Sequence, residues 1–554
     1  MMRTHESTSL SSSSLSHKMK SKYLCMGALI LSLPFVACQS ADTLLNVVSP
    51  TTVSDAIFWT QEADASLFVT GTYSALPGWF DVMGSDGLTD NGAVNRQFDG
   101  RYVYTDGSAD PQSGYSRGLW VQYYNGVART NILLANIDRI PAGKIDATRK
   151  ARYIAEAKFL RGVMYLQLTS LFGDVPMPLV PVTDAEARVL TNTPSAKVYD
   201  QVIADFDASA AVLPAAFTGA DYGRATKWAA IAMKARAALY AGRFQVAADA
   251  AKQVMDGGAF SLHPDYAQLF TYAGESNKEA IFVHTYAKTA QAIGQNNNVF
   301  GEYGPPTNSA AGHVVPIRSL VDSYQMKDGK SIATSPLYNP APYPNAGGTM
   351  YDNRDPRLAA TILYPGAAWD GGTFDSRPVG LSSRPEAINL GNENVSVTGF
   401  NIRKYVDLTD KADRGNGGID FMLMRYADVL LMYAEAKVAL GQADASALAA
   451  INLVRVRAGM PALSAVTEAD VRYERRAELA FEGLRLFDIR RWKIAAAVMP
   501  TAAVTGIDYI NTSGTKITAA QPASARAFPA RAYLWPIPQS ERDLNPSLTQ
   551  NPGY

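Results

Sequence analysis

The segment Ala147–Phe172 limits what this chain of 554 residues can fold into more than any other part of the sequence. One apolar face recurs at steps of three and four residues, through Ala157, Leu160, Met164, Leu168 and Leu171. Phe159, Val163 and Leu166 form a second apolar face. A helix that is apolar on two sides packs between other helices, and Gly173 with the prolines after it ends this one. The segment therefore predicts a buried helix inside a layered helical fold.

Two further segments have the small-residue pattern of a degenerate tetratricopeptide repeat, Thr226–Met255 and Met424–Gly459. Alanines in such a repeat let paired helices approach closely. The stretch between them, Phe260–Ile419, has little helical periodicity. We predict a mainly α fold, a tetratricopeptide-like helical scaffold at about 120–259 and 420–554 that carries a large irregular, loop-rich insertion at about 260–419.

The N-terminal sequence is typical of a secretion signal. Lysines 18, 20 and 22 precede the apolar stretch Tyr23–Val36, which is too short to span a membrane. Cys38 follows small residues as in a bacterial lipobox, so we expect its lipidation; an ordinary signal with an incidental cysteine is the alternative. The predicted parts are an extension with signal peptide at 1–37, a tether at 38–53 and one domain at 54–554, with Met1 and Met19 both open as the start.

Charge and composition exclude several classes of function. The chain has 51 basic and 51 acidic residues, and nucleic-acid binding needs a basic surface. The mature chain would keep only His263, His284 and His313, which lack metal-ligand spacing, so we predict no metal and no cofactor, with a calcium site of loop carboxylates left open. Gly114–Gly118 matches the GxSxG elbow of hydrolases, but a turn-rich stretch precedes it where a strand is needed. A hydrolase using Ser116 is thus a remote alternative, and we predict no enzyme.

Polar and aromatic residues mix in the loops, first in Gly78–Phe98 and again in the insertion. Aromatic faces stack on the C–H face of a sugar ring, while amides and carboxylates bind its hydroxyls. The residues predicted to bind ligand on this basis are Trp79, Asp86, Asn91, Asn95, Asn297, Tyr303 and Trp369. The alternative is that the rings anchor the loops and the polar side chains form turns.

The charged segment Arg472–Lys493 mixes both signs. We expect one solvated helix with pairs such as Glu482–Arg485 and Asp488–Arg491, and no binding patch for an acidic ligand.

Several segments occur together in the order of one known family. They are AEAKFLRGVMYLQLTSLFGDVPMPL (155–179), RATKWAAIAMKARAALYAGRFQVAADAAKQVM (224–255), NKEAIFVHTY (277–286), NRDPRL (353–358), LMRYADVLLMYAEAKVALG (423–441), ERRAELAFEGLRLFDIRRW (474–492) and LWPIPQSERDLNPSLTQNPGY (534–554). The chain resembles the SusD/RagB family of outer-membrane nutrient-uptake lipoproteins over nearly its whole mature length.

The resemblance implies a non-enzymatic lipoprotein, anchored in the cell outer membrane and facing outwards. Such a protein binds an oligosaccharide or related nutrient on a shallow aromatic surface and passes it to a SusC-like TonB-dependent transporter. The regions Trp79–Asn95 and Asn296–Tyr303 lie where members often contact ligand. Gln39–Ala41 departs from the acidic export signal often found after the lipidated cysteine. A lipid-anchored helical scaffold that binds protein or peptide is the alternative function.

Overall fold

The computed structural model describes residues 58–95, 99–289, 295–306, 310–389, 391–499, 504–520 and 526–554. Trp59–Tyr554 forms one compact unit. The predicted extension, signal peptide and tether, together with Cys38, lie outside the described residues. Among the described residues, no helix combines the length and apolar character that crossing a membrane requires.

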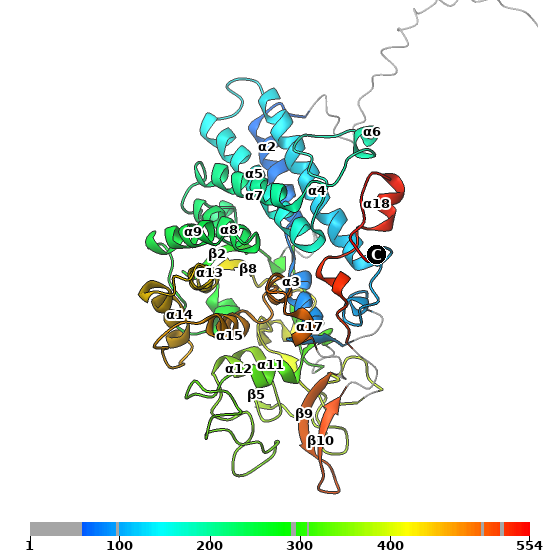
Figure 1. Cartoon of the computed structure of the whole chain (residues 1–554), viewed down its shortest axis with the longest axis vertical. Helices are drawn as coiled ribbons and strands as arrows, with labels where there is room; N and C mark the ends of the chain where they lie inside the picture. Colours follow the sequence, from blue (N-terminus) through cyan, green and yellow to red (C-terminus); the bar gives the residue numbers. More distant parts are fainter. Residues whose placement is uncertain are drawn as a thin grey trace, which may run out of the picture. The chain divides into compact units, whose positions relative to one another are not determined.

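The scaffold helices follow one another along the chain and pack against their neighbours (Figure 1). Their bounds are α2 Glu62–Thr72, α3 Trp79–Ser85, α4 Gly114–Asn136, α5 Ala147–Phe172, α6 Asp184–Ala187, α7 Ser195–Ala210, α8 Lys227–Tyr240, α9 Phe244–Asp256, α13 Tyr426–Ala439, α14 Ala445–Arg457, α15 Glu468–Leu479, α16 Arg485–Arg491, α17 Ala495–Val498 and α18 Gln539–Leu544. Helix α4 packs on α5, α5 on α7, α7 on α8 and α8 on α9. The row continues because α9 packs on α13, and α13 on α14 and α15. The mainly helical, tetratricopeptide-like fold is confirmed.

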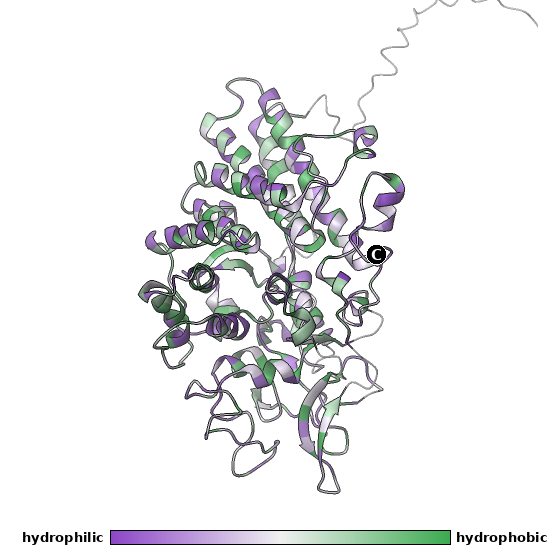
Figure 2. Ribbon diagram, in the orientation of Figure 1, coloured by the Kyte–Doolittle hydropathy of each residue, from purple (hydrophilic) through white to green (hydrophobic). Residues whose placement is uncertain are grey.

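Helix α5 is the buried helix that its two apolar faces predict. The Asp146 side chain caps it by accepting the Arg149 N–H at 3.0 Å, and Gly173 ends it with a φ of +75°. Phe159 is fully buried, with its ring 5.6 Å from that of Phe206 on α7. Figure 2 shows hydrophobic and hydrophilic residues side by side along these helices, as expected for elements that bury some faces and expose others.

Both segments with the repeat pattern fold as helix pairs. In Thr226–Met255 the pair is α8 and α9, with Gly242 at a φ of +70° between them. A positive φ favours glycine, so the sequence turns here without strain. In Met424–Gly459 the pair is α13 and α14. Ala237 on α8 and Ala247 and Ala251 on α9 are fully buried, and α8 packs on α9. Small side chains permit such close packing of paired helices.

The stretch 260–419 contains only short elements among its described residues. Its α-helices are α10 Val299–Tyr303, α11 Arg318–Ser323 and α12 Arg357–Thr361. The strands of the whole described chain, inside and outside this stretch, are β1 Gly92–Val94, β2 Ala280–His284, β3 Val314–Pro316, β4 Ile362–Leu363, β5 Ala368–Trp369, β6 Gly372–Thr373, β7 Asn401–Ile402, β8 Phe421–Arg425, β9 Thr505–Ile510 and β10 Lys516–Ala520. These strands form antiparallel pairs, β1 with β3, β2 with β8, β4 with β7, β5 with β6 and β9 with β10. The irregular, loop-rich insertion is confirmed as part of the fold class, while its boundaries stay a prediction.

The charged segment Arg472–Lys493 differs from its prediction as one solvated helix. It forms α15 and α16, which are separated by Phe481 and Gly483 at φ values of +61° and +76°. The Asp488–Arg491 pair forms at 2.8 Å, but Arg485 pairs with Asp90 instead of Glu482. The solvated-helix prediction is wrong because most of these charges are buried against partners far away in the sequence.

Glu478 is at the centre of this buried charge. Its carboxylate contacts the guanidinium groups of Arg425 at 2.7 Å and Arg357 at 2.9 Å, and also that of Arg457. Burial alone would raise the pKa of Glu478, but the three arginines hold it well below its ordinary value. The ion pairs of Glu478 therefore connect α15 to β8, α12 and α14.

We expect the substitution Glu478→Gln to lower the free energy of unfolding by about 3–5 kcal/mol, because it leaves buried arginines without their carboxylate. Chemical denaturation of the purified protein measures this change. Glu468→Gln on the same helix is the control, because Glu468 is exposed and pairs with Arg472 one turn away, so its loss is expected to change stability by less than about 1 kcal/mol. Equal effects of the two substitutions would contradict the central role of Glu478.

Candidate functional site

The structure buries six of the seven side chains that the sequence predicts to bind ligand. Their exposed fractions are Tyr303 0%, Asp86 0%, Asn91 1%, Asn297 1%, Trp369 5% and Asn95 7%. Trp79 alone among the seven is partly exposed, at the start of α3. Direct ligand contact by these residues stays a prediction, and the structure assigns the six buried ones contacts within the protein.

Asp86 and Asn91 fix the loop that follows α3. The carboxylate of Asp86 accepts the backbone N–H of Phe481 and, at 3.3 Å, the amide of Asn91. The side-chain oxygen of Asn91 accepts from Arg476 Nε at 2.9 Å. Burial raises the pKa of Asp86 to about 7, against the opposing effect of these hydrogen bonds. Both residues therefore bind the loop to α15 and to the turn after it.

The remaining buried residues connect loops or fill the core. Asn95 Nδ2 donates to the Val395 carbonyl at 3.0 Å, and its oxygen accepts the Val397 N–H at 3.1 Å. Asn297 Nδ2 donates to the Ile419 carbonyl at 2.9 Å. Trp369 belongs to a hydrophobic core that the insertion shares with α3 and α15. The two amides use their hydrogen-bonding capacity on backbone, as the alternative interpretation expects.

Trp79, Phe80, Tyr303 and His313 form what we call the aromatic cluster. The Trp79 and Tyr303 rings lie 6.0 Å apart, edge to face, and Phe80 lies 6.2 Å from Tyr303 and 6.4 Å from His313. The hydroxyl of Tyr303 donates to the Phe80 carbonyl at 2.7 Å. Trp79, Phe80 and His313 are each partly exposed, whereas Tyr303 is fully buried.

Charged groups surround this cluster. Arg101 lies over the Phe80 ring at 4.3 Å, donates to the Tyr303 hydroxyl at 3.2 Å and forms an ion pair with Asp99. His313 Nε2 lies 3.1 Å from a Glu302 carboxylate oxygen. Asp99 and Glu302 are only partly buried, so each keeps some access to solvent. Ring faces beside partly exposed carboxylates are groups that bind the C–H faces and hydroxyls of a neutral sugar.

Asp81, another carboxylate close to the cluster in sequence, has a raised pKa. Asp81 follows Phe80 on α3 and is partly buried. Burial raises the pKa of Asp81 to about 6, although Arg101 and a hydrogen bond from Tyr115 act in the opposite direction. The Asp81 carboxylate therefore accepts hydrogen bonds at neutral pH, and the protonated carboxyl can donate one in mild acid.

Sequence reasoning missed His313 as a member of the aromatic cluster, and Arg101 and Asp99 as its neighbours. Arg101 and Tyr303 are 202 residues apart in sequence, and no local pattern announces their contact. Glu302 is the one charged neighbour that the sequence indicates, because it directly precedes the predicted site residue Tyr303.

The GxSxG match is not a nucleophile elbow. Gly114 begins α4, and Ser116 is fully buried in the first turn, where its hydroxyl donates to the Ser113 carbonyl at 3.1 Å. Across the residues that the structure describes, no group of three His, Cys, Asp or Glu side chains is placed to hold a metal ion.

The fold is that of a tetratricopeptide-like helical protein, and comparison with known proteins agrees. The SusD family model matches residues 278–554, and a family described as starch-binding and associating with the outer membrane matches residues 81–239. The chain belongs to the SusD family. As a member it is a binding protein and not an enzyme, as the sequence predicts.

Individual relatives cover nearly the whole chain. A SusD-like protein of Formosa agariphila is 26% identical over 560 residues, which cover 94% of this chain and 97% of the relative. The crystal structure of a SusD-like carbohydrate binding protein from Bacteroides fragilis is 29% identical, covers 89% of this chain and 100% of its own, and has a TM-score of 0.79. A laminarin binding SusD-like protein shares the fold at 22% identity and a TM-score of 0.65, with 89% of this chain and 100% of its own covered.

Proposed function

We propose that this protein captures an oligosaccharide or related nutrient at the outer membrane and passes it to a SusC-like TonB-dependent transporter. The observation that carries the proposal is the aromatic cluster, in which the rings of Trp79 and Phe80 are partly exposed. The Asp99 carboxylate pairs with Arg101 over the Phe80 ring, and Asp81 follows Phe80 on α3. The carbohydrate-binding relative from Bacteroides fragilis and the laminarin binding relative support a glycan as the ligand class.

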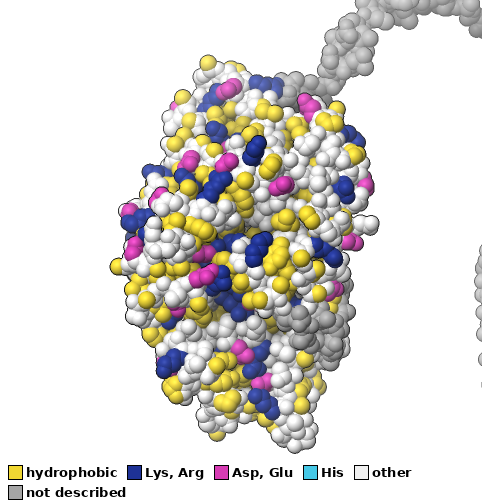
Figure 3. Space-filling model, in the orientation of Figure 1, with side chains coloured by type: hydrophobic (Ala, Val, Ile, Leu, Met, Phe, Trp, Pro, Cys, Tyr) yellow, Lys and Arg dark blue, Asp and Glu magenta, His cyan; other side chains and the backbone are white. Residues whose placement is uncertain are grey.

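The charge of the chain favours a neutral glycan at this site. Arg101 next to the cluster is already neutralised by Asp99, so it offers little attraction to an anionic polymer. On the face of the molecule in Figure 3, basic and acidic side chains are interspersed, in keeping with equal numbers of both signs in the sequence. A neutral sugar is held by stacking and by paired hydrogen bonds, which need no net charge.

The anchor in the proposal is a lipid on Cys38, with the folded unit held at the outer surface of the membrane. Lipidation, the transporter and surface exposure rest on the sequence before Trp59 and on membership of the SusD family. Multiple acyl chains on one residue give durable membrane binding, since each buried methylene contributes about 0.8 kcal/mol.

A groove on the scaffold favours the alternative, a lipid-anchored scaffold that binds protein or peptide. The groove measures about 490 Å³ and lies between α4, the segment 176–190 and α18. Val180 and Leu544 line it and are 63% and 53% exposed. Exposed apolar side chains in a groove are typical of a peptide or protein contact.

We expect Trp79→Ala to weaken oligosaccharide binding about tenfold, which corresponds to about 1.4 kcal/mol, because a stacking ring is lost. Calorimetric titration of the chain 42–554 with a panel of neutral oligosaccharides that includes laminarin fragments measures the affinity. Trp228→Ala is the control, since Trp228 is a partly buried indole on α8 that packs against Phe260. If peptides bound at concentrations where no oligosaccharide did, the alternative function would replace the proposal.

We expect the full-length protein to fractionate with the outer membrane and to co-purify with a TonB-dependent barrel when it is tagged in its native host. The variant Cys38→Ser should appear in the soluble fraction, because it cannot be acylated. Measurement of both fractions by immunoblot tests the anchor, and mass spectrometry of the purified complex tests the partner. Membrane retention of the Cys38→Ser variant would refute lipid anchoring at this position.

A further inference from the structure

A pocket of about 470 Å³ lies in the loop-rich insertion, between the segments 343–352 and 364–366. The first segment precedes α12 and the second connects β4 to β5, and Figure 1 shows α12 and β5 near the lower end of the view, below α3. The aromatic cluster is formed by α3, α10 and His313. The pocket is therefore lined by other residues than those of the aromatic cluster.

Two tyrosines supply the ring surfaces of this pocket, and both are partly exposed. Tyr364 stacks on the buried Tyr351, with 4.4 Å between the ring centroids and 19° between the planes. Tyr343 lies against Gly366, where a Cβ would come within 2.8 Å of the ring, so glycine permits this close approach. Neighbouring groups of the protein therefore hold both rings in place at the pocket.

The hydroxyls of both tyrosines are available to a ligand. In the part of the chain that the structure describes, neither Tyr343 nor Tyr364 uses its hydroxyl in a hydrogen bond, and both hydroxyls reach the solvent-accessible surface. A phenolic hydroxyl can donate one hydrogen bond and also accept one. Two such groups in one pocket suit a ligand that itself carries hydroxyls.

Asp352 adds a carboxylate beside these hydroxyls. It is exposed, and one of its oxygens accepts the Thr349 N–H at 2.6 Å, which leaves the other oxygen without a partner among the described residues. Burial raises the pKa of Tyr364, and the charge of Asp352 raises it further, so the carboxylate and the Tyr364 hydroxyl lie near each other. A ring face, a hydroxyl and a carboxylate thus meet at one pocket.

Hydrogen bonds within the loop shape the pocket without a ligand. Asn339 Nδ2 and Asn345 Nδ2 donate to the same carbonyl, that of Gly348, at 2.8 and 2.6 Å. The side chain of Met350 is fully buried, and its N–H donates to the Ala341 carbonyl at 2.9 Å. A site that is formed in advance loses little conformational freedom when it binds a ligand.

The charges at the pocket favour a neutral ligand. Within the described residues, Asp352 is the one charged side chain of the lining. Arg377 lies 5.4 Å from the centroid of the Tyr343 ring, but its guanidinium is paired with Asp375 at 2.7 Å. An anionic ligand would therefore meet an unpaired carboxylate oxygen and no unpaired cation in the lining.

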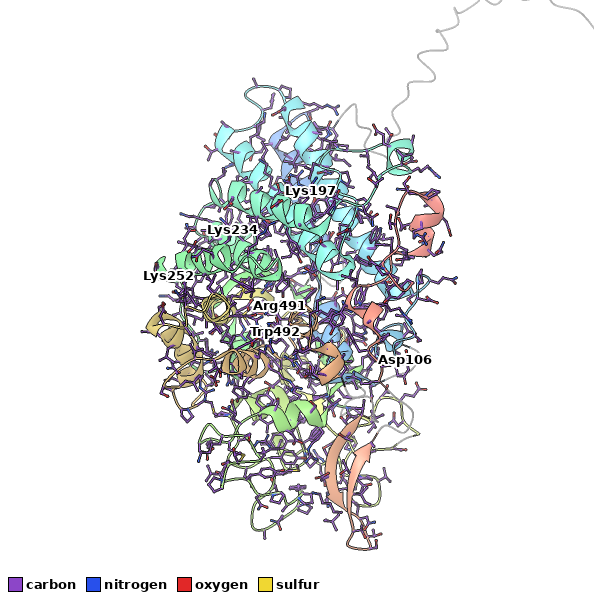
Figure 4. All side chains as sticks on the ribbon, in the orientation of Figure 1. Asp106, Lys197, Lys234, Lys252, Arg491 and Trp492 are labelled. Carbon is purple, nitrogen blue, oxygen red and sulfur yellow. The ribbon has the colours of Figure 1, made fainter. Side chains whose placement is uncertain are left out.

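A pocket of about 300 Å³ on the scaffold shows the contrast. Trp492 and Arg491 line it, and Figure 4 labels both near the middle of the view. Trp492 Nε1 donates to the Glu435 carboxylate at 2.7 Å, and Arg491 forms an ion pair with the same carboxylate. These two side chains already have a partner within the protein, whereas the hydroxyls of Tyr343 and Tyr364 have none.

We propose that the pocket of Tyr343, Tyr364 and Asp352 is a second sugar-binding site, which takes one neutral pyranose unit of a glycan. The C–H face of the sugar packs on a tyrosine ring, and its hydroxyls bond to the two tyrosine hydroxyls and to the free carboxylate oxygen. The ligand class rests on the proposed function, while the residues of this site are separate from the aromatic cluster.

Saturation-transfer NMR of the chain 42–554 with the panel of neutral oligosaccharides tests this site. We expect the variant Trp79→Ala to keep saturable binding, because the second pocket is unchanged in it. Adding Tyr343→Ala and Asp352→Asn is expected to weaken this residual binding by about tenfold, because a ring surface and a charged acceptor are lost. Tyr222→Ala in the same Trp79→Ala background is the control, since Tyr222 is a tyrosine outside the pocket lining that is 40% exposed.

A milder variant gives a readout even if Tyr343→Ala disturbs the loop. Tyr343→Phe keeps the ring and removes the hydroxyl, and we expect it to weaken the residual binding by about threefold. Loss of all binding in Trp79→Ala, or residual binding that the pocket variants leave unchanged, would overturn the second site but not the proposed function. If the unchanged protein bound none of the sugars, the proposed function would fail, and the second site with it.

Discussion

The ion pairs of Glu478 are the interaction on which the rest of the fold depends. One carboxylate neutralises arginines from β8, α12 and α14, and Glu279 and Glu474 complete the same buried network. Buried charges tolerate little displacement, because a lost partner leaves an unpaired ion in a medium of low dielectric. The network therefore fixes how the helical scaffold and the irregular insertion meet.

Helix α15, which contains Glu478, also fixes the position of the aromatic cluster. After α15 the chain turns at Phe481, whose N–H is bound by Asp86, and at Gly483, where a Cβ would lie 3.1 Å from the Val82 carbonyl. Arg476 of α15 and Arg485 of α16 both contact Asp90. These contacts fix the segment that contains α3, so the position of Trp79 follows from a buried charge network rather than from its own loop.

The sequence predicts helices well where a local pattern determines them. The two apolar faces and the Gly-Pro stop give α5 its bounds, and the alanine-rich segments give the helix pairs. The site is less predictable, because Asp86, Asn91 and Asn95 look the same in sequence whether they bind a ligand or hold a turn. Their partners lie hundreds of residues away, as with Asn95 and Val397, which are 302 positions apart. Only the folded chain separates these two roles, and the solvated-helix prediction for Arg472–Lys493 is wrong for the same reason.

A crystal structure of the protein with a bound oligosaccharide tests the central claim most directly. The account predicts electron density for a sugar ring stacked on the Trp79 indole, with its hydroxyls within hydrogen-bonding distance of the carboxylates of Asp81 or Asp99. A sugar bound on another face, with the aromatic cluster open to solvent, would contradict it.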